Sequence, residues 1–229
     1  MYIPIFVAGT NDPSNSYYLS QMWAKQLQNL GAEVEVFRIS DYNFEHFNLE
    51  MYEQDFEYAP AMKQLEATMK KADGFIIATP VWNFGVPANM SNFMDIMGLF
   101  GLDKEQRRHG QLNNMPFYLL VTGGAPHPAW NLVYKKCLAC FHFGMQYFGA
   151  VHAGSMYKGR CTIRGGGFGL VLDKDKTLPA LVEPKAKKFY NDVKAHKETG
   201  QLPTRLKLWR KWEKFQEWTF INIISKVWK

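Results

Sequence analysis

Three stretches of the chain are almost continuously apolar: residues 2–8, 74–79 and 115–122. Parallel strands that are covered on both faces have this composition, so we expect these stretches to be central strands of a sheet. Residues 33–38 instead alternate polar and apolar side chains, which indicates a strand with one less buried side at the edge of that sheet. A fifth strand is expected near residues 151–156.

Apolar residues between these strands recur at helical spacing. The expected helices cover residues 16–30, 60–71, 88–97, 132–148 and 181–197. Gly31 and Gly149 follow two of them, as glycine commonly does at the end of a helix. Strands that alternate with helices require right-handed crossovers. The sequence therefore predicts an α/β fold with a doubly wound, five-stranded parallel sheet in a three-layer sandwich.

The composition is that of an ordinary globular chain. Of 229 residues, 47% are hydrophobic, 21% are charged and three are cysteines, which excludes a disordered chain and a disulfide scaffold. A reducing, cytoplasmic location is the default for such a chain. The first apolar run is too short for an export signal, and no stretch reaches about 18 uninterrupted apolar residues. Neither export nor a membrane span is expected.

The excess of positive charge is concentrated at the end of the chain. Residues 1–203 carry 20 basic and 19 acidic side chains, whereas residues 204–229 carry 7 and 2. A neutral body does not indicate binding to nucleic acid. We therefore expect one domain at residues 1–200 and a basic, amphipathic C-terminal helix at residues 201–229.

Large apolar residues follow Thr204, a candidate N-cap, at helical spacing. They are Leu208, Trp209, Trp212, Phe215, Phe220, Ile223, Ile224 and Val227. A basic helix rich in Trp and Phe can lie on an anionic membrane, which would place the protein peripherally on the inner face. It can equally be a dimerisation arm that packs on a second copy. Both interpretations stay open.

Three unusual loops follow the predicted strands, at the end of a parallel sheet where ligands bind. The first, residues 9–16, leads into a helix, and its small side chains leave backbone N–H groups free for an anion such as phosphate. Ser14, Asn15 and Ser16 can add side-chain donors. The alternative is that Asp12, Ser14 or Asn15 simply caps the helix. The Walker and GxGxxG patterns are both missing from this loop.

The other two loops suit a flat ligand. Residues 79–87 hold Trp82 and Asn83 between prolines and a glycine, so a rigid turn projects an aromatic ring and an amide. Trp82 can instead belong to the core. Residues 122–128 begin Thr-Gly-Gly, and glycines let backbone N–H groups approach a ligand closely. The agreement of the three loops favours a ligand site.

With these residues the chain resembles the NADPH-dependent FMN reductases of flavodoxin-like fold over about residues 1–195. The resemblance rests on Gly9-Thr10, Ser14-x-Ser16, Asp41-Tyr42-Asn43, Ala72-Asp73-Gly74 and above all Thr79-Pro80-Val81-Trp82-Asn83-x-x-Val86-Pro87 with Asn92-Phe93-Met94-Asp95. It implies an FMN-binding homodimer or tetramer. Such a protein takes hydride from NADPH or NADH and passes electrons to quinones, azo dyes, metal ions or free flavin.

Carried over by position, the resemblance also implies the site residues. The FMN phosphate would be held by Thr10, Asn11, Ser14 and Ser16. The ribityl chain and isoalloxazine ring would contact Pro80, Val81, Trp82, Asn83 and Phe84, with Thr122, Gly123 and Gly124 at the pyrimidine edge. Many relatives carry an arginine in the first loop, whereas a carboxylate such as Asp12 is unfavourable near a phosphate. Asp12 then points away as a cap, or neutral donors alone hold the phosphate, or FMN binds weakly.

The chemistry of such a site needs little from side chains. The protein holds the ring, stacks the nicotinamide and polarises the N1/O2 end, for which the N–H groups of Gly123 and Gly124 are candidates. His127 is either a donor to flavin or substrate or a solvated loop histidine. No metal site is expected.

The favoured function is therefore an FMN-dependent NAD(P)H oxidoreductase that acts on a quinone-like or other small acceptor. The alternative is a flavodoxin-type electron carrier, which binds FMN without nicotinamide turnover. Such carriers resemble shorter and strongly acidic chains, so the neutral body weighs against it. A flavin-free scaffold that is kept for its tail is a third hypothesis.

Three further patterns have simpler explanations. Cys137 and Cys140 form a CxxC inside an apolar helical pattern, which favours two packed thiols over a redox or metal site. The glycine run at residues 165–169 predicts a flexible turn or lid rather than a phosphate loop. The lysines of residues 185–188 predict a solvated helix face.

Overall fold

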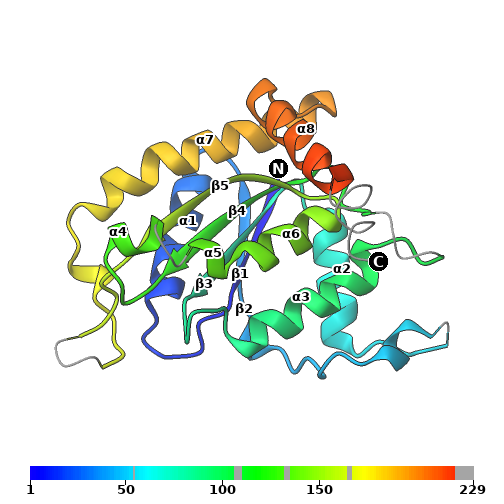
Figure 1. Cartoon of the computed structure of the whole chain (residues 1–229). Helices are drawn as coiled ribbons and strands as arrows, with labels where there is room; N and C mark the ends of the chain where they lie inside the picture. Colours follow the sequence, from blue (N-terminus) through cyan, green and yellow to red (C-terminus); the bar gives the residue numbers. More distant parts are fainter. Residues whose placement is uncertain (54, 106–109, 132–134, 164–166, 220–229) are drawn as a thin grey trace.

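A computed structural model describes residues 1–53, 55–105, 110–131, 135–163 and 167–219. Its centre is a five-stranded, fully parallel sheet with the strand order β2-β1-β3-β4-β5 (Figure 1). The strands are β1 (Tyr2–Val7), β2 (Glu33–Arg38), β3 (Phe75–Pro80), β4 (Pro116–Thr122) and β5 (Val151–Lys158). This order is that of the flavodoxin-like doubly wound fold, so the predicted fold class is confirmed.

The burial of the strands follows the predicted pattern. β1, β3 and β4 are buried at every residue, as expected for central strands. β2 lies at the edge of the sheet and alternates exposed and half-buried residues in its first half. Side chains of a strand point alternately to the two faces, and the sheet accordingly separates two hydrophobic cores.

Helices cover both faces of the sheet (Figure 1). One face carries α1 (Asn15–Asn29) and α7 (Leu178–Thr199), and the other carries α2 (Pro60–Lys71), α3 (Ala88–Gly101) and α6 (Ala139–Tyr147). On the first face, Trp23 and Phe189 both pack against Tyr118 of β4, with ring centroids 4.5 and 5.5 Å away. On the second face, Phe6 packs 5.0 Å from Phe93. The three-layer sandwich is confirmed.

One predicted helix is interrupted. The pattern at residues 132–148 predicts a continuous helix, whereas the described part of this range forms two helices, α5 (Lys135–Cys137) and α6, with a turn at Leu138 between them. The short helix α4 (His127–Ala129) precedes this range. Leu138 leaves the helical conformation, with φ −100° and ψ 3°, and buries its side chain in the core. Residues 132–134 lie outside the described residues.

The remaining helical elements agree with the pattern within a few residues. Gly31 and Gly149 have φ values of +95° and +93°, the left-handed region that glycine tolerates, so both predicted helix ends are confirmed. The lysines of residues 185–188 are exposed on α7, as predicted. Short 3₁₀ turns complete the chain: η1 (Ile39–Asp41), η2 (Leu49–Tyr52) and η4 (Leu172–Lys174).

The last described helix, α8 (Thr204–Thr219), is anchored to the body of the protein. Leu206 is fully buried in the same core as α1 and α7. Arg205 donates one hydrogen bond of 2.6 Å to the Asp192 carboxylate and another of 3.2 Å to the Ala153 carbonyl of β5. Thr204 is the first helical residue rather than the cap. Residues 220–229, with half of the predicted apolar stripe, lie outside the described residues.

No helix among the described residues is both long and apolar enough to span a bilayer.

Candidate functional site

The loops at the carboxyl ends of β1, β3, β4 and β5 meet in one cleft. Strand order reverses between β1 and β3, and open α/β sheets bind ligands at such a point. The enclosed volume is about 50 Å³, so the cleft encloses only part of a ligand. The lining residues are Asn11, Ser14, Asn15, Ser16, Pro80, Val81, Trp82, Thr122, Gly123, Gly124, Cys161, Thr162, Phe168 and Gly169.

The cleft brings together residues from all three loops that the sequence singles out. Most of the predicted site residues line it, but Thr10, Asn83 and Phe84 are exposed and lie outside the lining. His127 is exposed in α4, also outside the lining, with its ring 6.2 Å from that of Tyr157. A ligand role for these four side chains therefore stays a prediction.

A small cradle forms where β1 runs into α1. The hydroxyls of Ser14 and Ser16 lie 3.0 Å apart, and both residues are buried. A Cβ at Gly9 would come within 2.3 Å of Ser16 Oγ and 2.7 Å of Ser14 Oγ, so glycine leaves the space that these hydroxyls occupy. The first N–H groups of α1 have no partner within the helix. Hydroxyls and N–H groups at a helix N-terminus are suitable donors for a phosphate.

The capping alternative also holds, but only for Ser14. Its hydroxyl accepts a hydrogen bond of 3.3 Å from the N–H of Tyr17, which makes Ser14 the N-cap of α1. Asp12 is neither the cap nor a lining residue. Its side chain is 84% exposed, and its carboxylate lies 4.0 Å from the guanidinium of Arg38.

Arg38 is a residue of this region that the sequence analysis missed. The parallel register of β1 and β2 pairs it with Val7, just before the first loop. Its guanidinium donates a hydrogen bond of 3.3 Å to the Asn11 carbonyl and lies over the ring of Tyr17, 5.2 Å from the centroid. Arg38 thus brings positive charge to a loop that has no basic residue of its own. That charge offsets the carboxylate of Asp12.

The second loop carries a tight turn beside the cleft. Trp82 and Gly85 exchange two backbone hydrogen bonds of 3.0 and 2.9 Å around Asn83 and Phe84. The two central residues have φ values of 48° and 62°, as a two-residue hairpin turn requires. Asparagine tolerates this left-handed region, whereas phenylalanine is strained in it. Trp82 is half-buried in the cleft wall and belongs to neither core, so the core alternative is wrong.

The third loop is held by the sheet more tightly than the sequence indicates. The N–H of Gly123 donates a hydrogen bond of 3.0 Å to the Lys158 carbonyl, and its own carbonyl accepts one of 2.9 Å from the N–H of Cys161. The expectation that the Gly123 N–H is available to a ligand is therefore wrong. Gly124 is exposed at the cleft, and no described residue accepts its N–H. A Cβ at Gly123 would come within 2.9 Å of the Tyr157 hydroxyl.

Four lining residues that follow β5 were not predicted as part of the site: Cys161, Thr162, Phe168 and Gly169. The only signal was the glycine run at residues 165–169, of which Gly165 and Gly166 lie outside the described residues. Burial raises the pKa of the Cys161 thiol to about 11, so this thiol is neutral at pH 7. The side chains of Cys137 and Cys140 are not among those that the structure describes, and the CxxC hypothesis stays a prediction.

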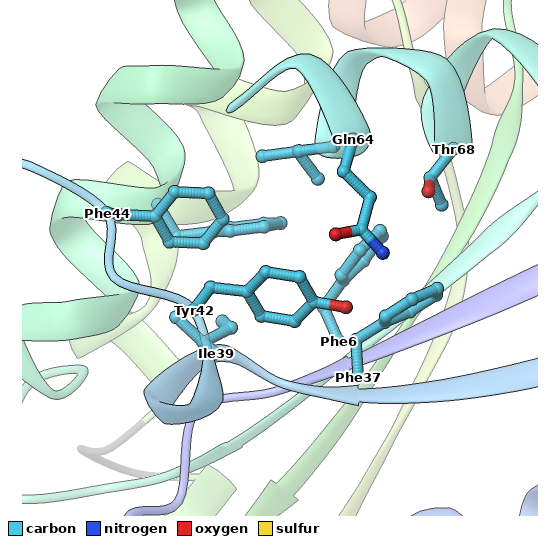
Figure 2. Close-up of a pocket in the computed structure, with 9 residues that line it drawn as sticks. Phe6, Phe37, Ile39, Tyr42, Phe44, Gln64 and Thr68 are labelled. Carbon is cyan, nitrogen blue, oxygen red and sulfur yellow. The ribbon is translucent and has the colours of Figure 1, made fainter. Parts of the chain in front are cut away.

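Two other cavities differ from the cleft in size and chemistry. Figure 2 shows an aromatic recess between α2 and the edge of the sheet, into which Gln64 and Tyr42 extend. Its volume is about 10 Å³, no more than one water needs, so it is a packing defect of the core. A groove of about 620 Å³ lies between β5 and α8, lined by residues such as Lys135, Arg205 and Trp209. This groove runs along the sheet edge, away from the carboxyl-end loops.

Comparison with known proteins gives consistent relatives. A family model described as NADPH-dependent FMN reductase matches residues 1–157. The chain is 34% identical over 79 residues to an FMN-dependent NADH:quinone oxidoreductase of Nitratidesulfovibrio vulgaris. The aligned region covers 33% of this chain and 37% of the relative. The chain is 29% identical over 93 residues to an NADH-dependent flavin reductase subunit 2 of Lactobacillus johnsonii, covering 40% of this chain and 46% of that one. The matched part thus spans less than half the length of these curated relatives.

Solved structures share the fold at low sequence identity. An NAD(P)H:quinone oxidoreductase from Methanothermobacter marburgensis has a TM-score of 0.65 at 16% identity, covering 84% of this chain and 98% of that one. RosB with bound 8-demethyl-8-formylriboflavin-5'-phosphate has a TM-score of 0.68 at 14% identity, covering 93% and 87%. These likenesses establish the flavodoxin-like fold. Because the family model covers more than half of the chain, the protein belongs to the NADPH-dependent FMN reductase family.

Proposed function

We propose that this chain is an FMN-dependent NAD(P)H oxidoreductase that reduces a quinone-like or other small acceptor. The observation that carries the proposal is the cleft, in which the Ser14–Ser16 cradle and the Trp82 turn open into one space. Membership of the reductase family supports an FMN cofactor and a nicotinamide donor. The family description names NADPH, whereas two curated relatives use NADH, so both nucleotides enter the test.

The donor set of the cleft fits FMN. Two buried hydroxyls 3.0 Å apart and the N-terminus of α1 match a phosphate dianion, and Arg38 adds positive charge behind Asn11. In this proposal Thr10, Asn11, Ser14 and Ser16 hold the phosphate, while the ribityl chain and ring contact Pro80, Val81, Trp82, Asn83, Phe84, Thr122, Gly123 and Gly124. When bound, FMN supplies the centre that accepts hydride and releases electrons.

The contribution of the chain itself is positioning. A hydrogen bond of 2.8 Å from the Val81 N–H to the Thr122 carbonyl joins the second loop to the third, which fixes Trp82 relative to Gly124. The N–H of Gly124, which no described residue accepts, is the backbone donor that can polarise a ring oxygen. The described lining residues include no carboxylate or histidine, and Cys161 is neutral at pH 7. We therefore expect turnover without an essential acid or base from the lining.

The test is reduction of the FMN-loaded protein by each nucleotide in an anaerobic stopped-flow instrument. We expect the flavin absorbance band to bleach within a turnover with NADPH or NADH, and to return when a quinone is added. A protein that binds FMN but is bleached by neither nucleotide would be a flavodoxin-type carrier. A protein that purifies colourless and does not quench FMN fluorescence would be a flavin-free scaffold.

The small enclosed volume also supports assembly of the chain into a homo-oligomer, a dimer or tetramer. A cleft of about 50 Å³ leaves most of an FMN-sized ligand uncovered, and a second copy that covers it would complete the site. Light scattering during gel filtration tests this assembly. A fully active monomer would contradict it.

The C-terminal helix supports a second, separate proposal, that the protein binds peripherally to an anionic membrane. Leu208, Trp209, Trp212, Phe215 and Trp218 are each between 44% and 63% exposed on α8. Basic residues flank them at Lys207, Arg210, Lys211 and Lys214. Aromatic side chains at the headgroup level together with flanking cations are typical of helices that lie on anionic lipid.

Sedimentation with vesicles tests the membrane proposal. We expect the protein to pellet with phosphatidylglycerol vesicles and not with pure phosphatidylcholine, and a Trp212→Ser, Phe215→Ser variant to stay in the supernatant. This variant keeps Leu206 and Arg205, which anchor the helix. If the wild type pellets with neither kind of vesicle and the variant elutes from gel filtration as a smaller oligomer, α8 is a dimerisation arm instead.

A further inference from the structure

The outer wall of the cleft comes from a segment that is remote in sequence from the first loop, which it contacts. Residues 167–172 return from the end of β5 and lie against the first turn of α1. Leu172 is buried in the core shared by α1 and α7, which anchors the far end of the segment. At the near end of the segment, the N–H of Ile163 donates a hydrogen bond of 3.0 Å to the Gly167 carbonyl.

Asn15 fastens this segment to the cradle. Its side-chain Nδ2 donates a hydrogen bond of 2.7 Å to the Gly169 carbonyl, and its Oδ1 accepts bonds of 3.0 and 3.2 Å from the N–H groups of Val171 and Leu172. Asn15 is 7% exposed, so these bonds are shielded from water. The side chain thus makes three hydrogen bonds to the wall, which use its oxygen and one N–H of its amide nitrogen.

The fastened segment carries an exposed aromatic ring to the cleft. Phe168 lines the cleft and is 73% exposed, and its ring lies 6.4 Å from that of Trp82 in an edge-to-face arrangement. Trp82 comes from the loop after β3, so the two rings reach the cleft from different elements. A largely exposed phenylalanine beside a tryptophan at a ligand cleft offers apolar surface to a flat ring.

We propose that Phe168 contacts the planar ring system of the ligand in this cleft, and that Asn15 is the positioning residue that holds Phe168 there. The proposal rests on the proposed function, since it takes the isoalloxazine of FMN as the ring. It adds a binding residue from the segment after β5, outside the three loops that the sequence singles out. It also assigns Asn15 a role in flavin binding that acts through the wall.

A double-mutant cycle on FMN affinity tests both parts. Quenching of FMN fluorescence by the full-length apoprotein gives Kd for the wild type, Phe168→Ala, Asn15→Ala and the double variant. We expect Phe168→Ala to weaken FMN binding about threefold to tenfold, the range of one aromatic contact. Asn15→Ala should weaken binding similarly in the wild-type background and have no further effect in the Phe168→Ala background, because its effect passes through that ring.

Matched variants separate this role from general stability. Phe143→Ala removes another exposed phenylalanine, 57% exposed on α6 outside the cleft lining, and should leave Kd unchanged. If Asn15→Ala does not fold, Asn15→Asp keeps the oxygen acceptors for Val171 and Leu172 and loses the bond to Gly169. Because its carboxylate would repel the phosphate of FMN, the affinity of this variant is measured with riboflavin. Iodide quenching of bound flavin should rise in Phe168→Ala, because the ring loses its cover.

The outcomes distinguish this inference from the function on which it rests. Wild-type affinity for FMN in Phe168→Ala would overturn the inference and leave the reductase proposal intact. Fully additive effects of the two substitutions would overturn the positioning role of Asn15. A wild-type protein that binds no FMN would overturn the proposed function, and the inference with it.

Discussion

Substitution of Gly9 by alanine is the most direct test of the phosphate cradle. A Cβ at this position would lie 2.3 Å from Ser16 Oγ and 2.7 Å from Ser14 Oγ, closer than such atoms approach in proteins. The two hydroxyls are 3.0 Å apart and buried, so they cannot both stay in place beside the new methyl group. Gly9→Ala should therefore disperse the hydroxyl donors of the proposed phosphate site while the rest of the cleft remains.

The magnitude follows from the interactions that are lost. A hydrogen bond to a charged group contributes about 1.5 to 3 kcal/mol, so losing two costs about 3 kcal/mol or more, roughly a hundredfold in Kd for FMN. Riboflavin lacks the phosphate and should bind the variant about as well as the wild type. The overpacked loop should also lower the free energy of unfolding by about 1 to 3 kcal/mol.

Fluorescence titrations with FMN and riboflavin measure both affinities, and thermal unfolding of the apoprotein shows whether the variant is folded. Gly85→Ala is the matched control. It makes the same chemical change in the second loop, where the nearest atom to the new Cβ is the Trp82 carbonyl oxygen at 4.0 Å. A folded Gly9→Ala protein with wild-type affinity for FMN, or with equal losses for FMN and riboflavin, would refute the cradle as the phosphate site.

Other parts of the structure give further expectations. Burial lowers the pKa of His142 to about 4 and of His152 to about 3, so below pH 6.5 the unfolded chain binds protons that the folded chain excludes. Lowering the pH from 7 to 5 should therefore reduce the free energy of unfolding, measured in urea, by about 2 kcal/mol per histidine. The substitution His152→Phe should weaken this pH dependence, whereas His46→Asn, at an exposed position, should not. Arg38→Met should weaken FMN binding severalfold at low salt and less at high salt, without affecting riboflavin; a loss that does not depend on salt would exclude an electrostatic role. Phe84→Gly should raise the free energy of unfolding by about 1 kcal/mol, because φ is +62°, and a lower urea midpoint would show that the turn is not strained.

The pattern of apolar residues was sufficient to predict the sheet, because central parallel strands are buried on both faces. β1, β3 and β4 have no solvent-exposed face, so their apolar runs are almost uninterrupted. The alternation of polar and apolar residues at 33–38 correctly placed β2 at the edge of the sheet. At residues 132–148 periodicity predicted the helical stretch but not the turn at the buried Leu138, which separates α5 from α6. A buried leucine fits a helix and a helix break equally well, so the pattern could not distinguish them.

The site also contains residues that the sequence could predict and residues that it could not. Loops that directly follow strands could be placed together from the sequence, since the carboxyl ends of parallel strands meet at one edge of the sheet. Arg38 could have been found by extending the same reasoning to β2, whose register with β1 puts it beside the first loop. Phe168 and the partners of Asn15 could not, because contacts across more than 150 residues leave no local pattern. The hydrogen bond that occupies the Gly123 N–H likewise depends on pairing with β5.

The bonds of Asn15 also bear on when the protein becomes competent to bind a ligand as it is made. Its partners lie 154 to 157 positions later in the chain, so the wall cannot form on the ribosome before residue 172 has emerged. A nascent chain that has already folded all five strands, up to Lys158, still lacks one side of its cleft. The part of the cleft that holds Phe168 is thereby added only after synthesis has passed the sheet.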